Sequence, residues 1–135
     1  EPKAREQKIV TLTAGEIGSN LINDGKAIIY GIYFDFDKAT IKPESQEQLD
    51  EIVSFLNDVD GNRFYIVGHT DNQGKLDYNV KLSQARAAAV VKALVASGID
   101  AGKLSPKGVG PLAPAASNSE EEGRALNRRV EIVAQ

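Results

Sequence analysis

Apolar and polar positions follow two spacings along the chain, one typical of strands and the other typical of helices. Dense apolar runs at 27–36 and 63–68 predict two strands, and an alternating run at 128–134 predicts a final strand. Apolar residues three or four positions apart predict helices over 43–57 and 77–97. Strands that alternate with helices in this way are typical of a sheet covered by helices.

Details of these runs give further expectations. The run at 27–36 is so continuous in Ile, Tyr and Phe that we expect a central strand. Residues 105–118 are rich in Pro, Gly, Ala and Ser, which favours a surface loop or a short irregular strand. Ser119 and Glu122 have the spacing of a capping box and predict a short helix through Leu126. One face of the 77–97 helix is expected to carry Leu82, Ala85, Ala89, Val90, Ala93 and Leu94.

The beginning of the chain has its own pattern. Residues 9–13 alternate as a strand does, and Ile17, Leu21 and Ile22 have helical spacing before Asp24 and a glycine. We therefore divide the chain into an N-terminal extension or linker, 1–26, with a strand and a helix, and a main domain, 27–135. The predicted fold class of the main domain is α+β, a mixed sheet of about four strands with helices packed against it.

Composition narrows the function classes. The 135 residues carry a formal net charge of −3, so a broad basic face for nucleic acid or an anionic membrane is not expected. The chain has no cysteine, which excludes disulfides and cysteine metal sites. It also has no methionine and begins at Glu1, so we expect that an upstream segment has been removed; a signal peptide and a membrane anchor are both open as its identity. No apolar run is long enough to span a bilayer.

Residues suited to catalysis are few. His69, Asp71 and Ser83 resemble the members of a serine hydrolase triad, but no GxSxG motif is present. A single histidine without cysteine makes a zinc site improbable, and we expect neither a metal nor a cofactor. The sequence therefore predicts a binding protein and not an enzyme.

The segments GHTDNQG and YNVKLSQARA suggest a binding site. Asp71 follows a predicted strand, and Arg86 lies about two turns into the next predicted helix. The two charges can meet at one cleft, either as a structural ion pair or as a site for a zwitterion, with its ammonium on Asp71 and its carboxylate on Arg86. Three arginines in GRALNRR can bind a carboxylate or phosphate, or pair with the nearby glutamates 120–122.

Four motifs in the same order make the chain resemble a known family. They are YFDFDKATIKPES, VGHTDNQG, YNVKLSQARAAAVVKAL and GRALNRRVEI. Together they resemble the C-terminal peptidoglycan-binding domain of OmpA, shared by peptidoglycan-associated lipoproteins and MotB stator proteins. The resemblance covers about three quarters of the chain and leaves residues 1 to about 26 outside.

The resemblance implies non-covalent recognition of diaminopimelate in peptidoglycan stem peptides. In the family, the Asp of GHTD and the Arg of LSxxRA hold the ammonium and carboxylate of diaminopimelate, and these positions match Asp71 and Arg86. Other family pocket positions fall on Phe36, Asp37, Thr70, Asn79 and one of Arg128 and Arg129.

The same resemblance implies a place in the cell. It places the chain in the periplasm, associated with the outer membrane through an N-terminal anchor that is missing from this sequence, where it attaches a membrane or an assembly to the cell wall. An envelope protein-interaction module with a weak wall site is the alternative. Other envelope proteins and a second copy of the chain stay open as partners, and a wall hydrolase is disfavoured.

Overall fold

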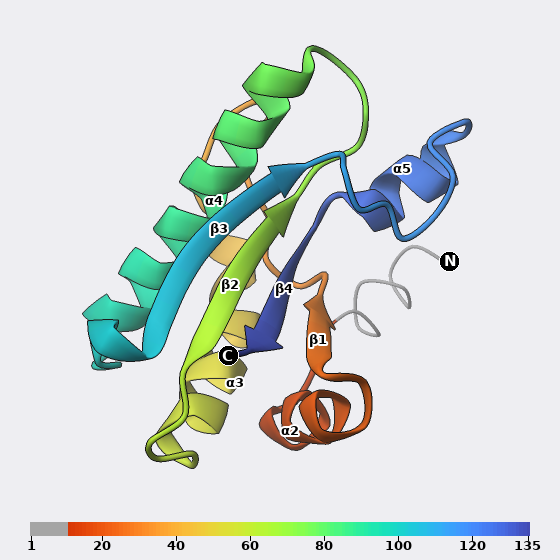
Figure 1. The fold of residues 1–135 in the computed structure, drawn as a ribbon. Helices are drawn as coiled ribbons and strands as arrows, with labels where there is room; N and C mark the ends of the chain where they lie inside the picture. Colours follow the sequence, from red (N-terminus) through yellow and green to blue (C-terminus); the bar gives the residue numbers. More distant parts are fainter. Residues whose placement is uncertain (1–10) are drawn as a thin grey trace.

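The structure is a computed structural model that describes residues 11–135. Its four strands form one mixed sheet in the order β1-β4-β2-β3, which confirms the predicted α+β class (Figure 1). Strand β2 runs parallel to β3, whereas β4 is antiparallel to both β1 and β2. The strands are β1 (Lys26–Ile29), β2 (Phe64–His69), β3 (Leu104–Gly110) and β4 (Arg129–Ala134). The helices are α2 (Ala14–Asp24), α3 (Gln46–Asn57), α4 (Leu76–Ala96) and α5 (Glu121–Asn127), with short 3-10 turns at Pro43–Ser45 and Ala101–Lys103.

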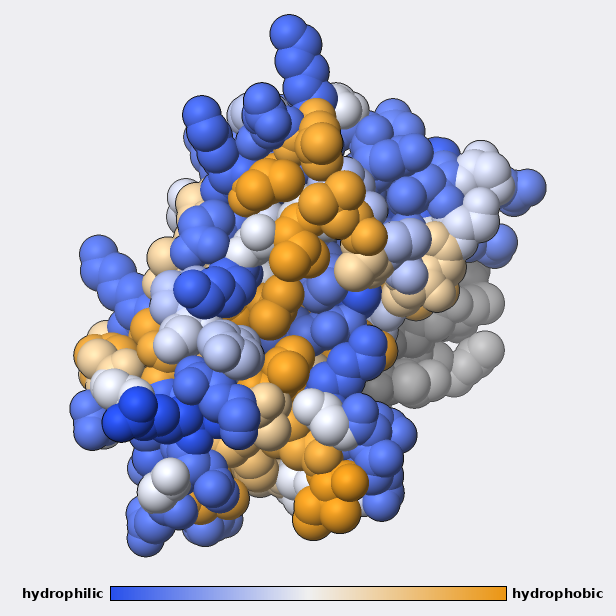
Figure 2. All heavy atoms as spheres, viewed as in Figure 1, coloured by the Kyte–Doolittle hydropathy of each residue, from blue (hydrophilic) through white to orange (hydrophobic). Residues whose placement is uncertain are grey.

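The hydrophobic core lies between the sheet and the helices. Alternate residues of the two central strands, among them Ile66 of β2 and Ile132 of β4, are fully buried there. Helices α3 and α4 lie behind the sheet in the view of Figure 1. Figure 2 shows a band of apolar side chains along the face of the sheet that is turned to the viewer. Among residues 11–135, the helices therefore cover one face of the sheet, and apolar side chains lie on the other face.

Helix α4 packs unusually close to the two parallel strands. A Cβ atom built on Gly68 of β2 would lie 2.3 Å from the backbone oxygen of Ser83, and one on Gly108 of β3 would lie 2.1 Å from the backbone nitrogen of Gln84. Only glycine fits at these contacts. The close approach fixes the first half of α4 beside the carboxyl ends of β2 and β3.

The expectation of a central strand over 27–36 is wrong. Strand β1 ends at Ile29 and lies at the edge of the sheet, and the central positions belong to β4 and β2. The apolar residues that follow are used differently: Ile32 packs into the core, and the backbone of Tyr33 is hydrogen-bonded through both N–H and C=O to the Ser45 hydroxyl. The apolar density of this run reflects packing of an irregular segment and not a long strand.

The expectation for residues 105–118 is confirmed: β3 is an edge strand whose register with β2 shifts near its end, and turns and loop follow it over 111–120. An edge strand tolerates Pro106. Two smaller expectations need correction. Helix α5 begins after Glu120, whose side chain makes no cap, so Ser119 is not the capping residue. On α4, Ala85 is exposed, and the sheet-facing positions are Asn79, Ser83, Ala87, Val90 and Leu94.

The predicted N-terminal helix is confirmed as α2. Thr13 and Glu16 form its capping box, and Gly25 ends it with a φ of 79°. Ile17 is fully buried in the same core as the sheet. The predicted strand at 9–13 is not found at residues 11–13, and residues 9 and 10 lie outside the described part. Among residues 11–135, no helix is long and apolar enough to cross a membrane.

Candidate ligand-binding site

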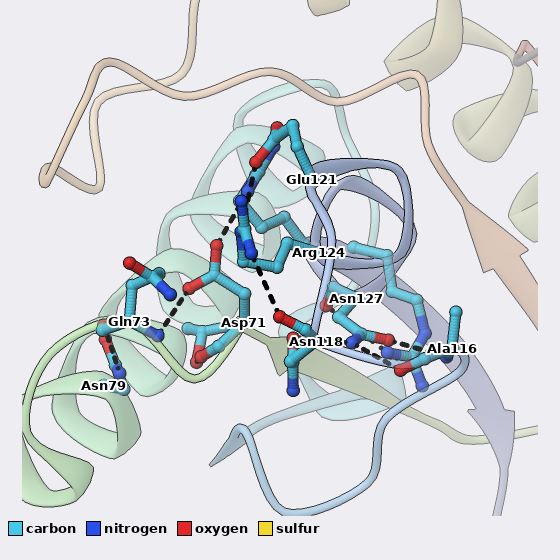
Figure 3. A network of polar contacts seen from close by, with 11 residues as sticks. Asp71, Gln73, Asn79, Ala116, Asn118, Glu121, Arg124 and Asn127 are labelled. Carbon is cyan, nitrogen blue, oxygen red and sulfur yellow. Dashed lines mark hydrogen bonds and ion pairs between the residues drawn. The ribbon is translucent and has the colours of Figure 1, made fainter.

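The carboxylate of Asp71 lies at the carboxyl end of β2, where the chain turns toward α4. Thr70 holds this turn: its N–H donates to the carbonyl of Gly110 (3.0 Å), and its hydroxyl donates to the carbonyl of Asp71 (2.7 Å). Asp71 is only 8% exposed, and its Oδ1 accepts a hydrogen bond from the backbone N–H of Gln73 (2.9 Å; Figure 3). A buried carboxylate in this setting is costly unless cationic groups face it.

Asn79 shapes the same turn from the first part of α4. Its side-chain amide donates to the carbonyl of Gln73 (2.9 Å), and the residue is buried (Figure 3). Gly74 completes the turn with a φ of 94°, a conformation that favours glycine. Thr70 and Asn79 therefore act on Asp71 through the backbone, because their side chains are engaged by main-chain groups.

Arg128 is the cation that pairs with Asp71. Its Nη1 lies 2.7 Å from Asp71 Oδ2, and its Nη2 lies 2.5 Å from Glu121 Oε2. In Figure 3 a dashed line ends on each of the two labelled carboxylates, Asp71 and Glu121. Burial disfavours the charge of Arg128, but the hydrogen bonds that it donates to Glu121 and Asp71 outweigh burial and raise the pKa of Arg128. The hydrogen bond from Arg128 is the main cause that lowers the pKa of Glu121.

Arg86 reaches the site from the third turn of α4. Its Nε donates to the carbonyl of Lys38 (2.8 Å), its Nη2 donates to the carbonyl of Asp35 (3.2 Å), and its guanidinium lies 4.8 Å from the centre of the Phe34 ring. Among residues 11–135, Arg86 Nη1 has no hydrogen-bond partner. Arg86 is thus held in place by backbone carbonyls while one arm of its fork remains available to a ligand.

The pKa of Arg86 shows which charges lie around it. Burial is the largest influence and lowers this pKa below its ordinary value, while Asp37, Tyr78 and Asp71 act in the opposite direction. Yet Asp71 and Arg86 form no ion pair within 4.0 Å in the described part of the chain, where Asp71 pairs with Arg128. A direct structural pair between Asp71 and Arg86, one of the two sequence-based alternatives, is therefore not what the structure contains.

The loop of residues 35–38 forms another wall of the site. Asp37 has a φ of 56°, and its carbonyl accepts a hydrogen bond from the Tyr78 hydroxyl (3.2 Å). Phe36, the neighbouring residue, is 88% exposed and projects from the loop without a partner in the core. Arg86 and Tyr78 together fasten this loop to α4, and its exposed aromatic ring lies one residue from the groups that they hold.

Arg129 lies apart from Asp71, unlike its neighbour Arg128. Its guanidinium is buried and bonds Glu131 Oε2 (2.8 Å), the carbonyl of Ala113 (2.9 Å) and the carbonyl of Asn127 (3.3 Å). Glu131 also faces His69 Nε2 at 3.4 Å. Burial raises the pKa of Glu131, but His69 and Arg129 outweigh this and lower it to about 2. The structure brings Arg128 to Asp71 and uses Arg129 in a buried network beneath.

The hydrolase and metal interpretations find no support in the geometry. The Ser83 hydroxyl donates to the carbonyl of Val80 and accepts from the N–H of Gly110, while His69 faces Glu131. No triad is therefore formed. Within residues 11–135, no group of three His, Asp or Glu side chains is arranged to hold a metal ion.

The sequence did not predict the contact of Tyr78 with the 35–38 loop or the backbone carbonyls that bind Arg86. Tyr78 directly precedes Asn79 at the start of α4, and its hydroxyl reaches a loop 41 residues away. The carbonyls of Asp35 and Lys38 orient Arg86, and no residue type in the sequence marks them. The sequence marks Glu121 only as one of three glutamates near the arginines, and the structure alone shows its specific bond to Arg128.

Comparison with known proteins gives matches over the same region. The OmpA family model matches residues 33–128. Outer membrane protein A of Bordetella avium is 48% identical over 100 residues, 74% of this chain and 52% of that protein. The peptidoglycan-associated lipoprotein of Burkholderia pseudomallei superposes with a TM-score of 0.70 at 33% identity, over 77% of this chain and 88% of that chain.

A further solved structure matches almost end to end. The cell wall anchor of the T6SS from Pseudomonas aeruginosa has a TM-score of 0.70 and 31% identity, and the match covers 93% of this chain and 99% of that one. The chain spans between about a third and about half of the length of several curated relatives, among them the Bordetella protein. On the extent of the family match and these identities, the chain belongs to the OmpA family.

Proposed function

We propose that the chain binds peptidoglycan non-covalently through the diaminopimelate of the stem peptide. One observation carries the proposal: a nearly buried carboxylate, Asp71, and a half-buried guanidinium with one open arm, Arg86, lie at one site without pairing with each other. Opposite charges that stay apart at a surface suit a ligand that carries both charges. The relatives named above include a peptidoglycan-associated lipoprotein and a cell wall anchor, which supports a wall ligand.

The roles of the two charges follow from their chemistry. The ligand's ammonium binds the carboxylate of Asp71, which still has lone pairs beside its bonds to Gln73 and Arg128. The ligand's carboxylate binds the open Nη1 of Arg86. Asp37, Thr70 and Asn79 shape the walls, and the exposed ring of Phe36 borders the entrance. We assign Arg128 a position beside Asp71 and leave Arg129 out of the pocket.

The expected affinity is modest. Two hydrogen bonds between charged groups contribute about 1.5 to 3 kcal/mol each, and ordering a flexible peptide costs several kcal/mol, so we expect a Kd of roughly 10 µM to 1 mM. A protein that faces a wall with many identical stems gains from a high effective concentration. Weak, reversible binding of this kind suits attachment of an outer membrane or an envelope assembly to the wall in the periplasm, without catalysis.

The experiment is sedimentation with isolated cell-wall sacculi. The unmodified chain should pellet with diaminopimelate-type sacculi, and Arg86→Ala should stay in solution while its thermal unfolding is little changed. Lys92→Ala is the matched control, because Lys92 is an exposed cation on the same helix. Equal sedimentation of Arg86→Ala and the unmodified chain would refute the assigned pocket.

A further inference from the structure

One ion pair at the site lies at the solvent edge and joins two elements. Arg128 uses one arm of its fork for Asp71 and the other for Glu121, the first residue of α5. The Arg128 side chain is 39% exposed and that of Glu121 is 64% exposed, whereas the Asp71 side chain is 12% exposed. The inner bond of Arg128 is therefore sheltered, and its outer bond is open to ligands.

Glu121 occupies a place where a ligand's carboxylate fits. A guanidinium arm binds any carboxylate that reaches it in plane, whether from the protein or from a ligand. Glu121 also accepts a longer hydrogen bond from Arg124 Nε (3.3 Å). Its carboxylate therefore keeps an ion pair with Arg124 when a ligand displaces it from Arg128. Exposed ion pairs of this type contribute little to stability, and a ligand that is already held nearby can replace one partner.

We propose that Glu121 fills a second carboxylate subsite on Arg128 and that a ligand with a further free carboxylate displaces it. This inference rests on the proposed function, because the zwitterion on Asp71 and Arg86 brings the further carboxylate to Arg128. The site then recognises a stem peptide by its diaminopimelate and also by a second acidic group. A peptide in which that group is amidated cannot use the subsite and binds more weakly.

The second acidic group has two possible sources in a stem peptide with the same chemistry. One is the α-carboxylate of the γ-linked glutamate, and the other is the carboxylate at the end of the peptide. We therefore specify four synthetic diaminopimelate tripeptides: both groups free, either one amidated, and both amidated.

The test compares Glu121→Gln with the unmodified chain by calorimetric titration. Glu122→Gln is the matched control, because it removes the same charge from the next, exposed residue of α5, which makes no ion pair within residues 11–135. We expect Glu121→Gln to bind the fully acidic peptide about two- to fivefold more tightly, because the competing carboxylate has gone. This gain should vanish for the doubly amidated peptide and for one of the singly amidated ones, which identifies the source.

Three results for the two variants would overturn the inference, and one result for the unmodified chain would refute the proposed function instead. Weaker or unchanged binding by Glu121→Gln would mean that Glu121 orients Arg128 and does not compete with the ligand. An equal gain in Glu122→Gln, or a gain that persists with the doubly amidated peptide, would indicate a general charge effect. Failure of the unmodified chain to bind any of the four peptides would instead refute the proposed function, so the two failures are distinguishable.

Discussion

The three arginines at and beneath the site differ in the groups that surround them. Arg128 is engaged by two carboxylates, Arg129 is buried against Glu131, and Arg86 alone keeps an arm without a protein partner among residues 11–135. Three residues of one type thus have three roles, set by which carboxylates and carbonyls the fold places around them. Direct ligand contact by a guanidinium is expected of Arg86 above all.

Arg86→Lys tests whether the fork of this guanidinium matters. Lysine keeps the charge, but its three donors sit on a single nitrogen and lack the planar fork with which arginine spans two backbone carbonyls and a ligand carboxylate. We expect Arg86→Lys to weaken binding of a diaminopimelate peptide at least tenfold, measured by calorimetric titration. Retention of the full affinity would mean that charge alone suffices at this position.

The ionisation of Glu131 makes the free energy of unfolding depend on pH. Its pKa in the folded chain is about 2, below the ordinary 4.5, so the folded state binds this proton less readily than the unfolded chain does. The ionised Glu131 side chain therefore contributes about 3 kcal/mol to the free energy of unfolding. This contribution is fully present above about pH 4.5 and is lost as the pH falls toward 2.

The measurement is chemical denaturation between pH 7 and pH 2 of the unmodified chain and of Glu131→Gln. We expect the variant to be less stable at pH 7, because it leaves Arg129 buried without a counter-charge, and to lose less stability on acidification. Parallel stability curves for the two proteins would contradict the assignment of the acid dependence to Glu131.

At the scale of elements, the contact between α4 and the two parallel strands places the site. Helix α4 carries Arg86 and Asn79, and β2 ends at the turn that carries Asp71. Because Gly68 and Gly108 let the helix backbone approach these strands, the glycines control the distance between the two halves of the site.

Gly68→Ala tests this contact. The added methyl group would meet the backbone of Ser83 at 2.3 Å, so the helix must move, and we expect a loss of about 1–3 kcal/mol in the free energy of unfolding together with weaker ligand binding. Gly15→Ala is the control, since its Cβ meets nothing closer than 4.0 Å and alanine favours helix. A Gly68→Ala protein as stable as the unmodified chain would show that the helix has room to shift.

Sequence patterns predicted elements well where one periodicity dominated. Strand β2 and helix α4 begin and end within one residue of their expected bounds. Helix α3 begins at Gln46, three residues after its expected start, because a 3-10 turn occupies Pro43–Ser45. The prediction of a central strand over 27–36 was wrong, because an irregular segment that is buried, as at Ile32, has the same apolar residues as a central strand. Strand β3 was hard to separate from a loop, because an edge strand tolerates proline and two of its glycines serve the contacts of the fold.

Residue types and spacing singled out Asp71 and Arg86 but left open whether they form an ion pair or a zwitterion site. The structure shows that Asp71 pairs with Arg128 instead, and the zwitterion site stays a proposal. The choice between Arg128 and Arg129 was not predictable, because two adjacent residues at the start of a strand point to opposite sides and the sequence does not say which side is buried. The contacts of Arg86 with backbone carbonyls leave no mark in the sequence, because every residue has a carbonyl.

At the scale of the whole molecule, helix α2 packs against the core of the family domain. Ile17 of α2 is fully buried, and the backbone of Leu12 is bonded through both N–H and C=O to the side chain of Gln48 on α3. The family match begins at residue 33, after this helix and strand β1. The boundary at residue 26 stays a prediction, and the packing of Ile17 favours one cooperative unit.

Ile17→Ala tests that cooperation. Removal of this buried side chain should cost about 2–5 kcal/mol and lower a single unfolding transition of the whole chain, measured by thermal and chemical denaturation. Ile22→Ala on the same helix is the control, since Ile22 is 85% exposed and should cost little. A separate early transition in Ile17→Ala, with the main transition unmoved, would mean that α2 folds independently.

The most direct test of wall recognition compares two stem peptides that differ in one group. An NMR titration uses a diaminopimelate peptide and its lysine counterpart, which has the ammonium but lacks the neighbouring carboxylate. We predict that only the diaminopimelate peptide shifts the signals of Asp71, Arg86 and their neighbours, with a Kd between roughly 10 µM and 1 mM. Equal binding of both peptides, or no binding of either at millimolar concentration, would contradict recognition of a zwitterion at this site.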